Sequence, residues 1–170
     1  MKLLEYLIAN NMARSYQNYK QNLNEQEQKL LEIGQLVKPY ETNFYFSEKG
    51  NMIYTDFKDD QINDISVRFH RFKEGSNSFE VEFAINGFSG EAFKTDTQHF
   101  FKIISTVVQV INEFIEKYQP TQLFIEGSDK IGKEGQKDKI WLQYAKVNIK
   151  ADNYTLGTYP KGFGLQKNIK

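Results

Sequence analysis

The sequence predicts an α+β fold, because two different periodicities divide the chain. Over residues 100–118, apolar side chains recur every three or four positions, which is typical of a helix with one buried face. Over residues 64–72 and 79–85, apolar and polar side chains alternate, which is typical of half-buried strands. A wide apolar helical face beside alternating strands indicates a helix that lies on a sheet. At 170 residues, the chain is predicted to be a single domain with a sizeable core.

Residues 1–38 are predicted to form a helical N-terminal part. A first helix over residues 2–21 has an apolar stripe made of Leu3, Leu4, Leu7, Ile8 and Met12. A second helix is expected over residues 24–37, because Asn24 and Glu27 have the spacing of a capping box. We expect both helices to cover the sheet, since amphipathic faces are buried within their own domain. The alternative is that the first helix docks on another subunit.

Residues 40–95 are predicted to form an antiparallel meander with one face in contact with water. Four strands are expected, over residues 42–47, 52–57, 64–72 and 79–85. Turns at Gly50 and Gly75 separate them, because glycine tolerates the positive φ that tight turns require. In the third strand, one set of side chains faces the core and the other faces solvent. The first set is Ile65, Val67 and Phe69, and the second is Ser66, Arg68 and His70.

Residues 96–119 are predicted to form the central helix, and residues 121–170 a strand, a helix and closing strands. Asp96 or Thr97 suits the N-cap of the central helix, and Pro120 ends it. Its buried side chains are expected to include Val107, Val108, Ile111 and Phe114. The elements that follow it are expected over residues 121–126, 136–150, 153–158 and 163–167.

Charge is balanced over the whole chain but not along it. The 22 basic and 22 acidic residues cancel, which argues against a general attraction to nucleic acid or anionic membranes. Residues 130–170 hold nine lysines against three acidic residues, a net +6, so residues 1–129 carry a net −6. The absence of cysteine excludes disulfides and thiolate chemistry. We expect no membrane span, because no apolar run is long enough, and no signal peptide at the N-terminus.

Few residues have the type and spacing that catalysis or metal binding needs. His70 and His99 are the only histidines, and neither has further metal ligands at a suitable spacing, so we expect both to be structural or exposed. Glu80 and Glu82 share a strand face, and the aspartates at residues 59–60 follow each other in a loop. Paired carboxylates serve acid–base chemistry when burial separates their pKa values. Here both pairs are expected to be solvated, so no catalytic residue and no metal site is predicted.

A segment rich in lysine and glycine at the start of the last helix is the candidate contact site. Its anion- or partner-contacting residues are predicted to be Lys130, Lys133, Lys137 and Lys139, among Gly127, Gly132 and Gly135. The segment lacks the G-x-x-x-x-G-K-[ST] pattern of a phosphate-binding loop, and a solvated loop is the alternative. Weak nucleic-acid binding through the same lysines, with Trp141 or Tyr144 stacking on bases, is a further alternative. The interleaved Glu134 and Asp138 argue against it.

The predicted order of elements resembles the N-acetyltransferase superfamily over about residues 1–167. In that superfamily, the N-terminus of the central helix receives the acyl-CoA pyrophosphate through Gln/Arg-x-x-Gly-x-Gly/Ala, whose free backbone N–H groups bind it. The corresponding residues 86–94 lack this glycine spacing and place Glu91 where it would repel a pyrophosphate. The resemblance therefore implies the topology without the cofactor, and a fold alone does not assign a function. A divergent acyl-CoA N-acetyltransferase is the alternative.

Residues 79–167 resemble a family of small phage-encoded proteins of unassigned function. The matching positions are Phe79, Val81, Phe83, Thr106, Val107, Pro120, Phe124, Ile125, Leu142 and Tyr144. Where that family often has Ser-Arg before its last helix, this chain has Gln136 and Lys137. The resemblance implies a phage or prophage origin. It brings no catalytic residues.

These observations together predict a non-enzymatic, phage-type protein that acts through protein contacts. We expect it to be a virion component or a host-directed factor, located in the virion or the host cytoplasm. Its expected partner is another protein or a second copy of itself, with no cofactor. If the chain has an enzymatic activity, the topology implies acyl transfer.

Overall fold

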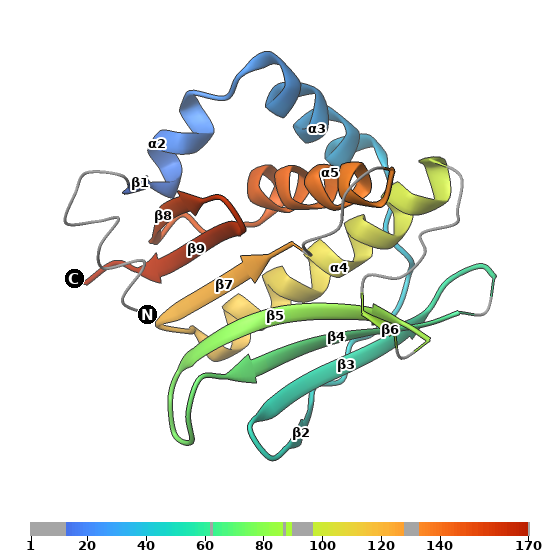
Figure 1. Cartoon of the computed structure of the whole chain (residues 1–170), viewed down its shortest axis with the longest axis vertical. Coiled ribbons are helices and arrows are strands. Elements are labelled where there is room, and N and C mark those ends of the chain that lie inside the picture. The colour runs from blue at the N-terminus through green and yellow to red at the C-terminus, as the bar shows by residue number, and fades with distance from the viewer. Residues whose placement is uncertain (1–12, 62, 87, 90–96, 128–132, 170) are drawn as a thin grey trace.

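The long helix predicted from the sequence, α4 (Thr97–Tyr118), crosses one face of a mixed β-sheet (Figure 1). The computed structural model describes residues 13–61, 63–86, 88–89, 97–127 and 133–169, and these ranges contain four helices and nine strands. The predicted α+β class is therefore confirmed. Residues 1–12, which carry the apolar stripe of the first predicted helix, lie outside the described ranges.

The described strands join in one sheet whose order is β1-β8-β9-β7-β5-β4-β3-β2, with β6 paired to β5 beside this path. Their bounds are β1 (Ala13–Ser15), β2 (Ser47–Lys49), β3 (Met52–Lys58), β4 (Asp64–Arg71), β5 (Ser78–Ile85), β6 (Phe88–Ser89), β7 (Gln122–Glu126), β8 (Tyr154–Tyr159) and β9 (Gly162–Lys167). Paired strands are antiparallel except β5 and β7, which are parallel. Parallel neighbours need a crossover connection, and α4 provides it.

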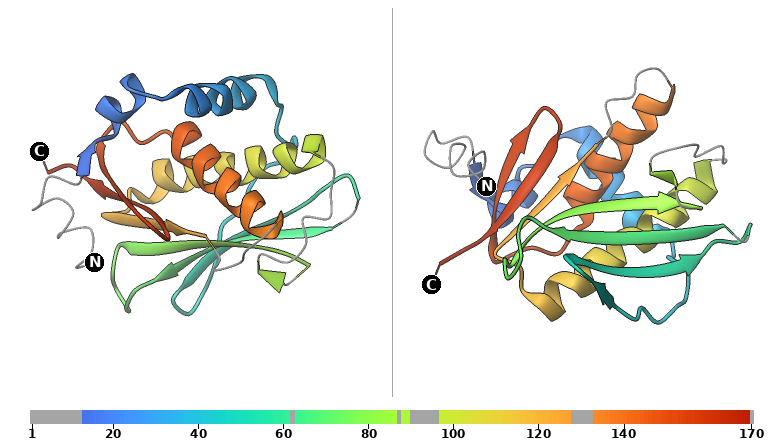
Figure 2. Two further views of the ribbon diagram at one scale, coloured as in Figure 1. Left: turned by 45° about the horizontal axis from the view of Figure 1, so that its top comes forward. Right: turned by 60° about the horizontal axis from the view of Figure 1, so that its bottom comes forward.

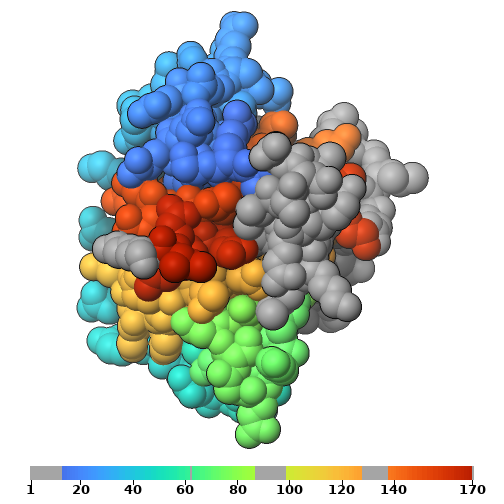
Figure 3. All heavy atoms as spheres, turned by 90° about the vertical axis from the view of Figure 1, so that its left-hand side faces the viewer, coloured from blue at the N-terminus to red at the C-terminus, as the bar shows by residue number. Residues whose placement is uncertain are grey.

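The helices are arranged in layers on one face of the sheet (Figure 2). α4 and α5 (Lys133–Asn148) lie against the sheet, α3 (Glu25–Leu36) lies outside them, and α2 (Tyr16–Gln21) lies beside the sheet edge. We expected both N-terminal helices to cover the sheet, but α3 packs on α5, and α2 packs at the sheet edge beside β1 and β8. Seen from the side, the N-terminal helices, the closing strands and the meander follow one another from top to bottom (Figure 3).

The first predicted helix, over residues 2–21, is wrong for Ala13–Ser15. These residues form β1 and pair with residues 155–157 of β8. The helix begins only at Tyr16, where the side-chain oxygen of Ser15 accepts the N–H of Asn18 at 3.1 Å and caps it. The edge of β8 offers backbone hydrogen bonds, which outweigh the local preference for a longer helix.

The second predicted helix is confirmed to within one residue at each end. Asn24 and Glu27 form the predicted capping box, with hydrogen bonds of 2.8 and 3.2 Å between side chain and backbone N–H. Gly34 lies inside this helix, where a Cβ atom would stand 2.1 Å from the side-chain oxygen of Asn148. The glycine therefore allows α3 to lie close to α5.

The predicted meander is confirmed in its later strands and wrong in its first one. Gly50 and Gly75 have φ angles of 60° and 74° in the predicted turns. Only Ser47–Lys49 pair with β3, whereas a strand was expected over residues 42–47. The ring of Phe46 packs edge-on against core aromatic rings of β4 and α4, so the chain before β2 follows the core surface instead of a strand edge.

The elements around α4 lie near their predicted ranges, with one addition. β7, β8 and β9 overlap the strands expected after the central helix, and α5 begins and ends earlier than residues 136–150. The short strand β6 was not predicted. Asn86 has a φ of 51°, and the chain after it pairs back on Ala84 and Ile85 of β5.

The core lies between α4 and the meander. The four side chains predicted to be buried on α4 are all at most 5% exposed: Val107, Val108, Ile111 and Phe114. The ring of Phe114 stacks on that of Phe69 with centroids 3.7 Å apart, and it meets Phe79 edge-on at 5.1 Å. Although α4 is 22 residues long, no helix in the described ranges is long and apolar enough to cross a membrane.

Phe114→Ala should lower the free energy of unfolding by about 3–5 kcal/mol, because it removes buried apolar surface and leaves a cavity. Equilibrium unfolding in urea measures this quantity. Leu36→Ala is the control, because Leu36 is 81% exposed and its removal should change the stability by less than about 0.5 kcal/mol. A loss below about 1 kcal/mol for Phe114→Ala would contradict the packing described here.

Candidate functional site

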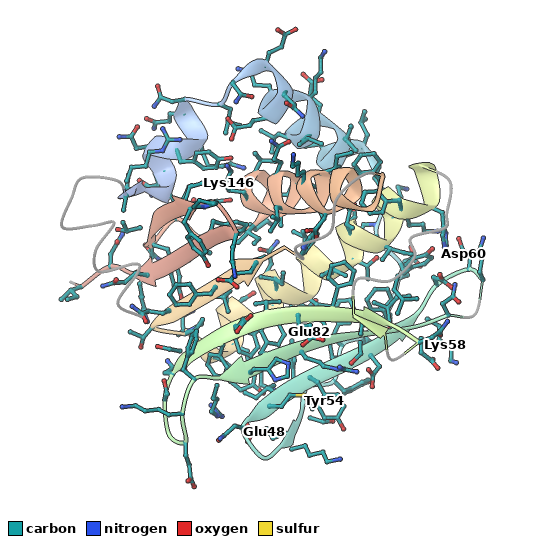
Figure 4. The ribbon with its side chains drawn as sticks, viewed as in Figure 1. Glu48, Tyr54, Lys58, Asp60, Glu82 and Lys146 are labelled. Atoms are coloured by element: carbon teal, nitrogen blue, oxygen red, sulfur yellow. The ribbon has the colours of Figure 1, made fainter. Side chains whose placement is uncertain are left out.

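Three buried side chains form a hydrogen-bonded relay beside the start of α4. Asp59 follows β3, His99 lies in the first turn of α4, and Tyr40 follows α3. The Nε2 atom of His99 is 2.9 Å from Oδ2 of Asp59, and its Nδ1 atom is 3.1 Å from the hydroxyl oxygen of Tyr40. We call these three residues the His99 relay. Figure 4 places the neighbouring Asp60 at the end of the meander where β3 finishes.

Local sequence features bring these side chains together. His99 lies four residues before the buried Ile103, so the helical period turns its ring inward. The loop after β3 closes on the carboxylate of Asp59, which accepts the backbone N–H groups of Gln61 and Asn63 at 2.9 and 2.8 Å. The side chain of Asn63 donates to the same carboxylate at 2.8 Å. The loop is thus shaped by the group that binds the histidine.

Burial and hydrogen bonding shift the pKa values of two groups in the relay, Asp59 and Tyr40. Burial alone would raise the pKa of Asp59, but the hydrogen bonds from Asn63, His99 and Gln61 outweigh it and lower that pKa. Burial raises the pKa of Tyr40 to about 12, with a further contribution from the negative charge of Asp60. Tyr40 therefore stays protonated at neutral pH. Its hydroxyl is hydrogen-bonded to Nδ1 of His99, and Nε2 of His99 is hydrogen-bonded to Asp59.

This geometry favours a structural role for the relay over a catalytic one. A nucleophile or base must present a free lone pair to a substrate. Here the hydroxyl of Tyr40 is hydrogen-bonded to His99 and accepts the N–H of Asp60 at 3.4 Å. The backbone N–H of Tyr40 also donates to Thr106 of α4 at 2.9 Å. The relay therefore fastens the segment after α3 and the loop after β3 to the start of α4.

The outcome differs between the two aspartates that were expected to be solvated. Asp60 is exposed, as expected, and lies 3.4 Å from the ammonium group of Lys102. Asp59 is buried, so the expectation is wrong for it. The prediction for Asp59 was wrong because residues in loops are usually exposed to solvent. The helical period of α4 is enough to predict that His99 points inward. It does not predict that Asp59 is the partner of His99.

The open face of the meander carries the other carboxylate pair. Glu80 and Glu82 share this face, as predicted from the alternation of β5. Glu82 lies 3.1 Å from Nε2 of His70 and 3.7 Å from Arg68 (Figure 4). Burial raises the pKa of Glu80, and the negative charge of Glu126 adds to the shift. The described ranges contain no group of three or more His, Asp or Glu side chains that could hold a metal ion.

The predicted lysine site is described only in part. Lys139 is exposed on α5. Lys133 and Lys137 belong to α5, but their side chains lie outside the described part of the structure, as does the whole of Lys130. Gly127 comes so close to α5 that a Cβ atom would lie 2.4 Å from a carboxylate oxygen of Asp138. The role of these lysines as anion or partner contacts stays a prediction.

The parallel strands β5 and β7 separate after four paired positions, and we call this opening the β5–β7 fork. Pairing covers residues 78–81 of β5 and residues 122–125 of β7. Beyond it, the edge of β5 at Ala84 and Ile85 pairs with β6. On the helix side, the ring of Phe83 meets Trp141 of α5 edge-on, with centroids 4.9 Å apart. Both flanks of the fork are therefore occupied by the chain itself.

No protein-family model, no curated protein and no solved structure matches the chain. The case for its function therefore rests on the geometry of the described residues.

Asp59→Asn should lower the free energy of unfolding by about 1–3 kcal/mol at pH 7, because an amide cannot accept all the hydrogen bonds that reach this carboxylate. The folded pKa lies below the unfolded value of about 3.9. The stabilisation by the carboxylate is therefore complete above that value and is lost as the pH falls through the folded pKa.

The difference in unfolding free energy between the parent protein and Asp59→Asn should consequently shrink below about pH 4. Urea unfolding at a series of pH values measures it. Asp60→Asn is the matched control, and the exposed position of Asp60 predicts a small effect at every pH. If the effect of Asp59→Asn were the same at pH 3 and pH 7, the ionised relay would be disproved.

Proposed function

We propose that this chain is a non-enzymatic, phage-type protein with an acetyltransferase-like arrangement, and that it acts through protein contacts. Its role would be that of a virion component or a host-directed factor. The observation that supports this choice over an acyltransferase is the occupied β5–β7 fork. Support for the arrangement comes from the order of elements: an antiparallel meander, a crossover helix, a parallel strand, a helix and a closing hairpin.

The fork matters because it is where this topology offers room to a cofactor. Ligands of sheets with parallel strands bind outside the carboxyl ends of those strands. In this chain, β6 occupies one side of that space, where it is hydrogen-bonded to the edge of β5. Phe83 and Trp141 are in contact on the helix side, and Trp141 is buried. An acyl-CoA chain would have to displace both the strand and the ring pair.

The same choice is supported by the chemistry of the ionisable groups. Acyl transfer to an amine needs a base that removes a proton. The His99 relay uses both ring nitrogens of its histidine internally. Glu80 and Glu82 lie on the open face of the meander, whereas Trp141 and α5 flank the fork on the helix side. A chain with this geometry is better suited to present a surface than to carry out a reaction.

The uneven charge of the chain supports self-association as one form of contact. Within the described residues, the pair Lys146 and Glu27, 3.9 Å apart, joins the positive C-terminal part to the negative remainder. Lys139, Lys150 and Lys161 are exposed and available to another molecule. Ion pairs that the exposed lysines formed with another copy would contribute about 0–1 kcal/mol each, so they would steer assembly more than they would stabilise it.

Titration calorimetry with acetyl-CoA should detect no binding to the parent protein at concentrations up to about 1 mM. The physical reason is that the fork is filled by β6 and by Phe83 with Trp141. Micromolar affinity would contradict the proposal if Gly90→Trp, in the segment of the sequence before α4, abolished it. Lys73→Trp is the matched control, because it adds the same ring at an exposed turn on another part of the chain.

Replacing Lys130, Lys133, Lys137 and Lys139 with Gln should leave the melting temperature nearly unchanged, because the sequence predicts solvated lysines here and solvated charges contribute little to stability. Any salt-sensitive self-association should weaken in this variant, as sedimentation at low and high salt would show. DNA binding by the parent protein at physiological salt, lost in the variant, would instead favour the nucleic-acid alternative.

A further inference from the structure

The face of the sheet that lies opposite the described helices changes in character at β7 (Figure 2). On the meander, this outer face carries charged side chains such as Arg68, His70 and Glu82. From β7 outward to β1, a row of directly opposite residues on the same face is apolar or lacks side chains. We call it the Phe124 row, and its members are Phe124, Gly164, Gly157 and Ala13.

The burial of Phe124 is the observation that points to an occupant of this face. Phe124 is 4% exposed, although the alternation of β7 turns its ring away from α4 and α5. Its neighbours across the sheet are Glu80, which is exposed, and Gly164, which has no side chain. Its described ring contact is with Phe72, edge-on at 5.4 Å, and Phe72 is itself 45% exposed. Because one edge-on ring covers only part of an aromatic side chain, the burial of Phe124 indicates a further segment on this face.

The segment that leads into β1 is suited to this position. Residues 1–12 join the sheet at Ala13, which lies at the outer end of the Phe124 row. Their apolar stripe, noted for the first predicted helix, has the spacing of one helical face. Phe124 is three strand spacings from Ala13, or about 14 Å at about 4.8 Å each. A helix of ten residues is about 15 Å long, so the segment can reach the whole row.

We propose that residues 1–12 dock as an amphipathic helix on the outer face of β8, β9 and β7, with Leu4 and Leu7 against the Phe124 row. The two glycines of the row let a helix lie close to the sheet, because they have no Cβ atom to hold it away. Beyond Phe124 the row continues with Glu80, and Lys2 precedes the apolar stripe, so opposite charges meet at the far end.

Attachment to β1 favours the chain's own segment over that of a second copy. Docking on a second copy would cost the translational freedom of a whole molecule, whereas a segment that is already joined to the row at Ala13 loses none. The occupant of this surface is therefore the chain itself. This docking goes beyond the proposed function and does not depend on it, because it uses neither the β5–β7 fork nor the lysine segment.

Disulfide trapping tests the placement, because the chain has no cysteine of its own. Leu7→Cys is combined with Gly164→Cys, and the rate of oxidation is followed by gel mobility without reductant. The bond should form within one molecule and at least about tenfold faster than in the control pair, since a disulfide needs Cα atoms within about 7 Å. The matched control combines Ala9→Cys with Gly164→Cys, because Ala9 lies opposite the stripe on a helix.

Three outcomes of the trapping experiment would overturn the proposal. They are equal rates for the two pairs, no disulfide in either pair, and disulfide-linked dimers, which would assign the surface to a second copy. Gly164→Cys alone is first checked for a melting temperature close to that of the parent protein. If this variant does not fold, Thr155→Cys on the same face of β8 replaces it.

A second measurement leaves the sheet unchanged. Leu7→Asp in the full chain puts a charge into the apolar stripe, so the segment should leave the Phe124 row and expose it. Fluorescence of the dye ANS, which reports exposed apolar surface, should rise about threefold or more. Ala9→Asp adds the same charge on the opposite side of the helix and should give the parent's fluorescence, with circular dichroism showing that both variants stay folded. No rise for Leu7→Asp, or an equal rise for both variants, would contradict the docking.

Discussion

Burial of the apolar face of α4 is the constraint on which the rest of the structure depends. Among the described strands, backbone pairing joins the meander to the closing strands only between β5 and β7, over four residue pairs. α4 is the connection between these two strands, and its buried side chains lie against the sheet. Stacking of Phe114 on Phe69 joins the helix to the middle of the meander. Without that packing, the two parts of the sheet would share little more than one short parallel ladder.

The end of α5 explains why the N-terminal helices lie where they do. The last carbonyls of a helix lack partners within it. Here the hydroxyl of Tyr16 donates to the carbonyls of Lys146 and Ile149, and the ammonium group of Lys20 donates to that of Val147. The positive charge of Lys20 near the C-terminal end of α5 also interacts favourably with the helix dipole. Because α2 is tied to α5 in this way and α3 packs on α5, the outward side of α4 borders a groove instead of a third layer.

Two features limit the chemistry of this fold: the hydrogen bonds of the His99 relay and the occupied β5–β7 fork. The His99 relay fastens the segment after α3, the loop after β3 and the start of α4, with its proton donors and acceptors used internally. The β5–β7 fork, where a cofactor would enter a sheet of this topology, holds β6 and the contact between Phe83 and Trp141.

The sequence by itself determined the elements whose signals are local and periodic. These include the buried stripe of α4, the alternation of β4 and β5, the capping box of α3 and the two glycine turns. Each depends on residues within a few positions of one another, where helix and strand geometry dictate which side chains share a face. The position of His99 on the inner side of α4 belongs to this class as well.

Tertiary structure alone decided the features that bear on function. Asp59 and His99 are 40 residues apart, and the burial of Asp59 depends on how the loop after β3 closes against α4. The strands β1 and β6 exist because the edges of β8 and β5 offer hydrogen bonds, although the local sequence did not indicate either strand. The contact between Phe83 and Trp141 likewise arises from segments that only the fold brings together. No periodicity records such contacts, because they are set by the packing of distant segments and not by the residues that flank them.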